Sequence, residues 1–125
     1  MAMKFIEVSG YKEYSSEEDI KNTILNMLSA PRTQSIIALT DGGMLGGAVS
    51  KFPFGPHYIA TEVAWWVDPE KRKSGLGREL LRYFEIWAGV VNCSFVSMGS
   101  LNDELAKLYE KEGYKLYERA YMKVL

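Results

Sequence analysis

Residues Ala64–Leu81 read AWWVDPEKRKSGLGRELL. The part before Asp68-Pro69 belongs to a run rich in β-branched and aromatic residues, so we expect a largely buried strand over Glu62–Val67 that the Asp-Pro pair ends. The part after it predicts a helix, because apolar residues recur three to four positions apart, as on one helix face. These residues are Leu76, Leu80, Leu81, Phe84, Trp87 and Ala88.

The loop between strand and helix has the features of an anion-binding site. The first N–H groups of a helix have no partner within the helix, and the helix dipole adds partial positive charge there. Gly75 and Gly77 allow a phosphate to approach the backbone, and Arg72, Lys73 and Arg78 add full charges. A ligand carrying a pyrophosphate is therefore expected, and the alternative is that the glycines only form a tight turn.

Two segments resemble the GNAT superfamily of acyl-CoA N-acyltransferases. Arg72–Gly77, RKSGLG, fits the R/Q-x-x-G-x-G/A signature, and Asn102–Tyr114, NDELAKLYEKEGY, resembles the family's N-x-x-A-x-x-L-Y-E-K-x-G-F segment. The family alanine falls one position late, at Ala106, and Tyr114 replaces the usual phenylalanine. In its small size and in the residues of these motifs, the chain also resembles GNAT proteins found in phage genomes.

This resemblance implies a fold and a cofactor. The fold would be α+β, a mixed, mostly antiparallel twisted sheet flanked by helices, with a V-shaped splay between two parallel central strands. Residues 1–125 would form a single domain. Acetyl-CoA would lie in the V, its pantetheine and acetyl carbonyl held by the backbone of Trp65, Trp66 and Val67. Its pyrophosphate would be bound by Arg72, Lys73, Ser74, Gly75, Leu76, Gly77 and Arg78. Asn102 would contact the pantetheine arm, and it also suits a helix cap.

The resemblance also suggests catalytic residues. Tyr109 would protonate the leaving thiolate, and the alternative is a helix tyrosine that packs on the sheet. Glu62 lies near the position of a glutamate base in some family members, but one residue out of register, which reverses its face unless a bulge intervenes. Ser97 occupies the position where other members have a glutamate. Proton loss to water and a role for the lone histidine, His57, are further alternatives.

Outside these motifs the sequence predicts a simple order of elements. A helix capped by Ser15 or Ser16 runs to about Ser29 and is stopped by Pro31. Asp41-Gly42-Gly43 is a hairpin turn, and Gly46-Gly47 allows a bulge or a close backbone approach. The remaining expected elements are a strand at Met3–Val8, strands at Thr33–Leu39, Met44–Phe52 and Cys93–Met98, a helix at Asn102–Lys111, and a closing hairpin of Tyr114–Leu116 with Arg119–Val124.

Composition limits the function classes. The chain has 125 residues, 47% hydrophobic and 25% charged, with a net charge of -1, so nothing in its charge indicates nucleic-acid binding. No apolar run reaches the ~18 residues of a membrane span, and no residues have metal-ligand spacing. One cysteine, Cys93, fits a reducing compartment, so we expect a cytoplasmic protein.

Three functions compete at this stage. The first is an N-acetyltransferase that moves an acetyl group from acetyl-CoA to a primary amine of a small molecule or protein, by direct attack in a ternary complex. The second is a catalytically silent module that keeps the CoA site or only the fold. The third, a nucleotide-binding protein, ranks last because the loop lacks both the G-K-[S/T] of a P-loop and the first glycine of G-x-G-x-x-G. The sequence leaves a homodimer open.

Overall fold

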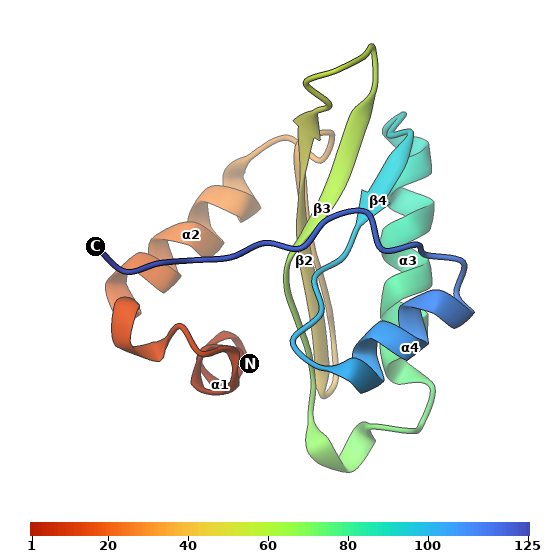
Figure 1. Cartoon of the computed structure of the whole chain (residues 1–125). Helices are drawn as coiled ribbons and strands as arrows, with labels where there is room; N and C mark the ends of the chain where they lie inside the picture. The colour runs from red at the N-terminus through yellow and green to blue at the C-terminus, as the bar shows by residue number, and fades with distance from the viewer.

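The computed structural model describes residues 1–125 and is built around one mixed sheet. Its strands, in the order β1-β2-β3-β4, are β1 (Ser35–Thr40), β2 (Gly43–Lys51), β3 (Tyr58–Val67) and β4 (Phe95–Ser97). The first three pair antiparallel, and β3 and β4 pair parallel. Helices α1 (Ala2–Ser9) and α2 (Glu17–Ser29) lie on one side of the sheet, and α3 (Leu76–Val90) and α4 (Asp103–Lys111) lie on the other (Figure 1). This confirms the expected α+β class with a mostly antiparallel sheet.

The core lies between the sheet and α3. Phe84 and Leu81 of α3 and Leu45 of β2 are fully buried, because the apolar stripe of the helix faces the strands. Phe84 and Leu45 form one buried cluster with Ile36, Ala60, Leu80, Trp87 and Ala88. The Trp87 indole N–H also donates to the Arg32 carbonyl at 2.8 Å, which ties α3 to the segment before β1. The central helix predicted from the apolar spacing is therefore confirmed.

Two glycine predictions in β2 are confirmed together. The β2–β3 register shifts between Gly46 and Gly47, so a bulge is present. A Cβ at Gly47 would collide with the ring of Phe84, so the absence of a side chain allows α3 to pack closely on the strand. The preceding hairpin turns at Asp41-Gly42, where Gly42 has a φ of 83°. The serine cap is also confirmed, because the Ser16 side chain accepts from the Asp19 N–H.

The strand predicted at Met3–Val8 is wrong, because these residues lie in α1. A short apolar run does not separate strand from helix by its pattern alone. Here Ala, Met, Lys and Glu are good helix formers, and Gly10 ends the helix in the left-handed conformation with a φ of 83°. The result leaves one edge of β1 without a partner strand.

The closing hairpin is wrong as well. Residues 114–125 contain no strand, and beyond Tyr114 they are exposed. The segment runs from α4 across the view toward the α1–α2 side of the sheet (Figure 1). β4 is also shorter than the predicted Cys93–Met98, with only three residues paired to β3. A hairpin needs a wider sheet to pack on, and this short edge strand offers little.

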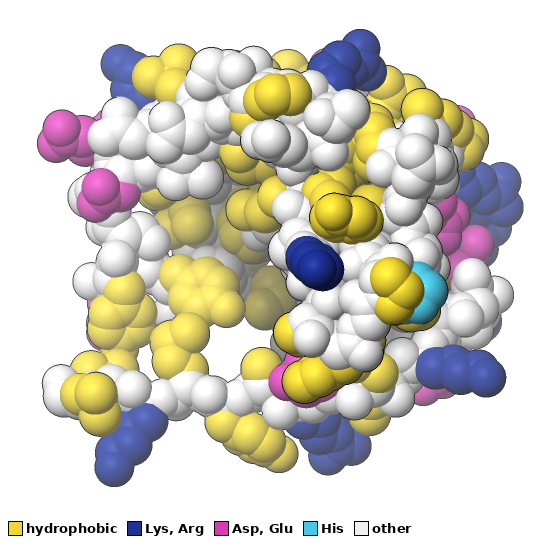
Figure 2. All heavy atoms as spheres, turned by 90° about the horizontal axis from the view of Figure 1, so that it is seen from above, with side chains coloured by type: hydrophobic (Ala, Val, Ile, Leu, Met, Phe, Trp, Pro, Cys, Tyr) yellow, Lys and Arg dark blue, Asp and Glu magenta, His cyan; other side chains and the backbone are white.

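The surface is mixed in character. From the end that carries the β2–β3 loop, hydrophobic side chains lie around a hollow, and the lysines and arginines lie mostly at the periphery, with one basic side chain near the centre of the view (Figure 2). None of the helices combines the length and the apolarity needed to cross a bilayer.

Candidate functional site

The two parallel strands separate where the site is expected. β4 pairs with β3 only at Ile59, Ala60 and Thr61, and its last paired residue is Ser97. β3 continues to Val67 with β2 as its sole partner. The Asp68 N–H donates to Gly42 on the β2 side, so strand alternation directs the backbone groups of Trp65 and Val67 to the opposite, open edge. The Val67 carbonyl accepts from Arg72 Nε, and the other backbone groups of this edge have no strand partner and can bind an extended ligand.

A bulge in β3 decides which side chains face this split. Gly47 pairs with Glu62 and Gly46 pairs with Ala64, so Val63 has no partner of its own. Ala60 and Trp65 both pack against the α3 core, although an odd separation would put them on opposite faces of a regular strand. The bulge resolves this conflict and places Glu62 on the same face as Ala60 and Trp65. The sequence alone had left the face of Glu62 undecided.

One residue of the loop after β4 connects the two candidate catalytic side chains. The Gly99 N–H donates to Glu62 Oε1 at 3.1 Å, and the Tyr109 hydroxyl donates to the Gly99 carbonyl at 2.7 Å. Tyr109 comes from α4, and it is buried. Glu62 and Tyr109 therefore lie together at the split, on either side of the Gly99 backbone.

The buried environment raises the proton affinity of both candidate side chains. Burial raises the pKa of Glu62, and the Gly99 N–H opposes that rise by stabilising the charged carboxylate. Burial, and next the negative charge of Glu62, raise the pKa of the Tyr109 hydroxyl. The phenol therefore stays protonated at neutral pH and releases its proton less readily than an exposed tyrosine, and the ionised carboxylate is a stronger proton acceptor than an exposed one.

The two tryptophans lie on opposite faces of β3, as alternation predicts. Trp65 stacks on Tyr109 with ring centroids 6.0 Å apart, and its indole N–H is buried without a hydrogen-bond partner. Trp66 lies on the other face, where it donates to Asp68 at 2.8 Å and lies under the guanidinium of Arg72. An unpartnered buried donor is costly in a folded protein, so this indole N–H is a local energetic cost at the site.

The loop that leads into α3 presents free backbone donors. The N–H groups of Lys73, Gly75, Gly77 and Arg78 donate to no atom of the chain. Gly75 has a φ of 91° and open space where a Cβ would be, and a Cβ at Gly77 would lie 3.3 Å from the Trp65 ring. The remaining loop residues are structural: the Ser74 hydroxyl donates to Lys71 and accepts from Leu76, whose side chain packs on the core. The glycine loop and Trp65 are thus in contact, and the donors suit an anion.

The three basic residues at this loop differ in how free their charges are. Arg72 donates from Nε to the Val67 carbonyl at 2.9 Å, at the end of β3. Arg78 forms an ion pair with Glu112 of α4 at 2.7 Å, which offsets part of its charge. Lys73 is exposed with a φ of 68° and makes no ion pair. All three lie beside the free amides, and Lys73 has the least compensated charge.

The other candidate residues fall into two groups. Asn102 caps α4, because its Oδ1 accepts from the Leu105 N–H at 2.9 Å, and it adjoins the Gly99 loop. His57 is not brought to the site: it lies at the start of β3, where its Nδ1 is 2.9 Å from the Ser94 hydroxyl. Gly99 was not identified from the sequence, because a glycine in the Ser-Met-Gly-Ser run after a strand indicates only a loop.

A protein-family model matches most of the chain. The model, described as the acetyltransferase (GNAT) family, covers residues 2–114. S-(2-succino)cysteine N-acetyltransferase of Bacillus subtilis (strain 168) is 32% identical over 82 residues, which are 59% of this chain and 50% of that protein. The chain therefore spans about half the length of this curated relative.

Solved structures share the fold at low sequence identity. A protein titled a transcriptional regulator from Bacillus halodurans C-125 has a TM-score of 0.79 at 14% identity, covering 100% of this chain and 91% of that one. AAC(6')-Iy in complex with the bisubstrate analog CoA-S-monomethyl-acetylneamine has a TM-score of 0.69 at 17% identity, covering 88% and 80%. At these identities the likeness concerns the fold.

Proposed function

The chain belongs to the acetyltransferase (GNAT) family, and on that premise we propose that it transfers an acetyl group from acetyl-CoA to a primary amine. The observation that carries the proposal is the split between β3 and β4, with free amides at one end and the Glu62–Gly99–Tyr109 arrangement within it. Groups suited to anion binding and to proton transfer thus lie at the same split of the sheet. A cytoplasmic location is part of the proposal.

The fit to acetyl-CoA rests on the donors present. The unpaired N–H groups of Lys73, Gly75, Gly77 and Arg78, with the charges of Arg72 and Lys73, would bind the pyrophosphate. The open strand edge at Trp65 and Val67 would bind the pantetheine amides, and Asn102 would contact the same arm. When bound, the cofactor supplies an acyl group already activated as a thioester. The complex of AAC(6')-Iy with a CoA-containing analog, in a protein of this fold, supports the assignment.

Residues of the chain would then carry out the proton transfers. A primary amine is a cation at neutral pH, so Glu62 accepts one proton and leaves a neutral nucleophile. The nitrogen bonds to the acyl carbon, the carbon–sulfur bond breaks, and the Tyr109 hydroxyl gives its proton to the departing sulfur. The second proton lost by nitrogen returns to Tyr109 through solvent. The products are an amide, a free thiol and one proton released.

The test combines binding with turnover. We expect CoA and acetyl-CoA to raise the melting temperature, because a ligand that binds only the native state stabilises it. We expect acetyl-CoA to release thiol in the presence of an amine panel that includes S-(2-succino)cysteine, the substrate named for the Bacillus subtilis relative. Tyr109→Phe should lower kcat by roughly 10²-fold and leave the Kd for acetyl-CoA unchanged, because a general acid acts in the transition state.

The outcomes separate the two main candidates. Binding without thiol release above background across the panel would support the silent CoA-binding module. No thermal shift at millimolar acetyl-CoA would contradict the acetyl-CoA site itself. A Tyr109→Phe variant that turns over at the wild-type rate would remove the role proposed for the hydroxyl.

A further inference from the structure

One edge of the sheet has no partner strand, although its first outward N–H, that of Ser35, donates to the Pro31 carbonyl. β1 pairs with β2 and with no other strand. The Val49 N–H donates to the Gln34 carbonyl, so alternation directs the backbone groups of Ile37 and Leu39 outward, to the free edge. Natural edge strands carry charges, prolines or bulges that block further pairing, and Ser35–Thr40 has none of them.

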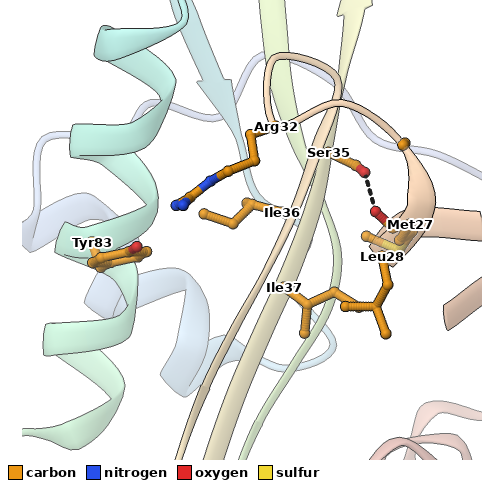
Figure 3. A pocket seen from close by; sticks show the side chains of 8 residues that line it. Met27, Leu28, Arg32, Ser35, Ile36, Ile37 and Tyr83 are labelled. Carbon is orange, nitrogen blue, oxygen red and sulfur yellow. Dashed lines mark hydrogen bonds between the residues drawn. The ribbon is translucent and has the colours of Figure 1, made fainter. Parts of the chain in front are cut away.

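Two apolar pockets lie along this edge. The first, at the Ser35 end, is lined by Met27 and Leu28 of α2, Ile36 and Ile37 of β1, and Tyr83 of α3 (Figure 3). The second, at the Thr40 end, shares Ile37 and Tyr83 and continues to Leu39 and Leu76. Together they form a groove that follows β1 between the helices of the two faces. Leu28 and Leu39 are 64% and 69% exposed, so the groove leaves apolar surface uncovered.

The two ends of this groove carry opposite charges. Arg32 lines the pocket at the Ser35 end, and Glu79 lines the pocket at the Thr40 end. Neither side chain forms an ion pair within the chain. In an antiparallel pair of identical strands, the start of one strand lies beside the end of the other, so Arg32 of one copy would face Glu79 of the second copy twice.

We propose that β1 pairs antiparallel with β1 of a second copy, about a two-fold axis near Ile37 and Tyr83. The partner is a second copy because the positive end of one groove then lies against the negative end of the other, at both ends of the antiparallel pair. Such an interface uses the same surface on both copies and therefore closes at a dimer. The β3–β4 split lies at the opposite edge of the sheet, so both sites stay accessible and the association is independent of the proposed chemistry.

The first experiment blocks the edge and measures mass by light scattering after size exclusion, at micromolar concentrations. The wild type is expected to be a dimer. Leu39→Pro should be a monomer, because it removes an outward N–H and leaves the β1–β2 ladder intact. Leu39→Ala, which changes the same side chain but keeps the N–H, should remain a dimer. Circular dichroism checks that both variants fold.

The second experiment uses the charges and does not depend on the proline. Arg32→Glu and Glu79→Arg should each weaken the dimer by about tenfold or more, because like charges then face each other. An equimolar mixture of the two variants should form a heterodimer of wild-type affinity, since one of its two charge pairs is then the native pair and the other is a pair of opposite charges in reversed sense. A wild-type monomer, an open polymer, a Leu39→Pro dimer, or a mixture that fails to associate would each overturn the proposal, and the last would point to a different partner for this edge.

Discussion

At the scale of single residues, the link through Gly99 distinguishes this site from a collection of separate side chains. Its N–H holds one oxygen of Glu62, and its carbonyl holds the proton of Tyr109. In this arrangement the phenol proton points to a carbonyl, so proton donation to sulfur requires Tyr109 to exchange that acceptor. The proposed acid and base therefore respond together to any movement of the Gly99 loop.

Glu62→Gln tests the base through the pH dependence of activity. Only the ionised carboxylate accepts a proton, so kcat/KM of the wild type should rise with pH through the pKa of Glu62. Burial raises that pKa, which moves the rise above the usual carboxylate range toward neutral pH. The variant should lose this rise and be slower by roughly 10²-fold or more. If the amine loses its proton to water instead, Glu62→Gln should leave the rate and its pH dependence unchanged. Glu104→Gln, which changes an exposed glutamate, is the control.

Glu62→Gln should also change the stability of the fold, in the direction opposite to its effect on activity. Because the pKa of Glu62 is raised in the folded state, folding is penalised at pH values above it, where the group must be charged. Glutamine keeps an oxygen for the Gly99 N–H and removes the charge. We therefore expect Glu62→Gln to melt at a higher temperature than the wild type at pH 7, with the difference vanishing below the pKa of the unfolded chain. A variant that is less active but more stable is difficult to explain as a packing defect.

At the scale of elements, the α3 N-terminus and its loop act as one binding unit. The element was predictable from the sequence because glycines, positive charge and a helix start coincide within Arg72–Arg78. The direction of the free N–H groups was not, since it depends on the left-handed conformation of Gly75. The sequence also did not show that the charge of Arg78 is partly neutralised, because its partner Glu112 is distant in sequence.

Gly75→Asp, compared with Gly75→Asn, isolates charge at this element. Asparagine and aspartate both tolerate the left-handed conformation, and open space surrounds the position, so the two variants should fold with similar stability. The aspartate adds a negative charge at the proposed pyrophosphate site, and we expect its Kd for CoA to be at least about tenfold weaker than that of the asparagine variant. Isothermal titration at low salt measures this. Equal affinities would exclude this loop as the pyrophosphate site.

At the scale of the whole molecule, the sequence predicted the central half of the fold and failed at its ends. The β1–β2 hairpin, the strand, loop and helix of the site, and the α4 segment each carry a local signal in turn residues, caps or periodicity. Whether the two ends of the chain form strands depends on which edges of the sheet are free to pair. Residues distant in sequence decide this, so a local pattern does not predict it. The side of the sheet on which Glu62 lies could not be predicted for the same reason, because the bulge depends on pairing with Gly46 and Gly47.

The packing of α3 on the sheet gives a matched stability prediction. Gly47→Ala should lower the free energy of unfolding by about 1–3 kcal/mol, because the new methyl group meets the buried ring of Phe84. Gly89→Ala, in α3 with no atom near its Cβ, should raise it by about 0.5–1 kcal/mol through reduced chain entropy. Thermal melts should thus shift in opposite directions. A neutral Gly47→Ala would show that α3 can move away from β2 without cost.

The unpaired Val63 makes this strand sensitive to length as well as to composition. Deleting that single residue would let β2 and β3 pair without interruption and would keep the glutamate on the face of Trp65, because the two residues would then lie two positions apart in a regular strand. If the bulge were instead straightened with Val63 retained, the acid would turn to the opposite face and leave Tyr109, although no functional residue had been replaced. For the same reason, an ungapped alignment of this strand with an unbulged relative would match the wrong residue to the base.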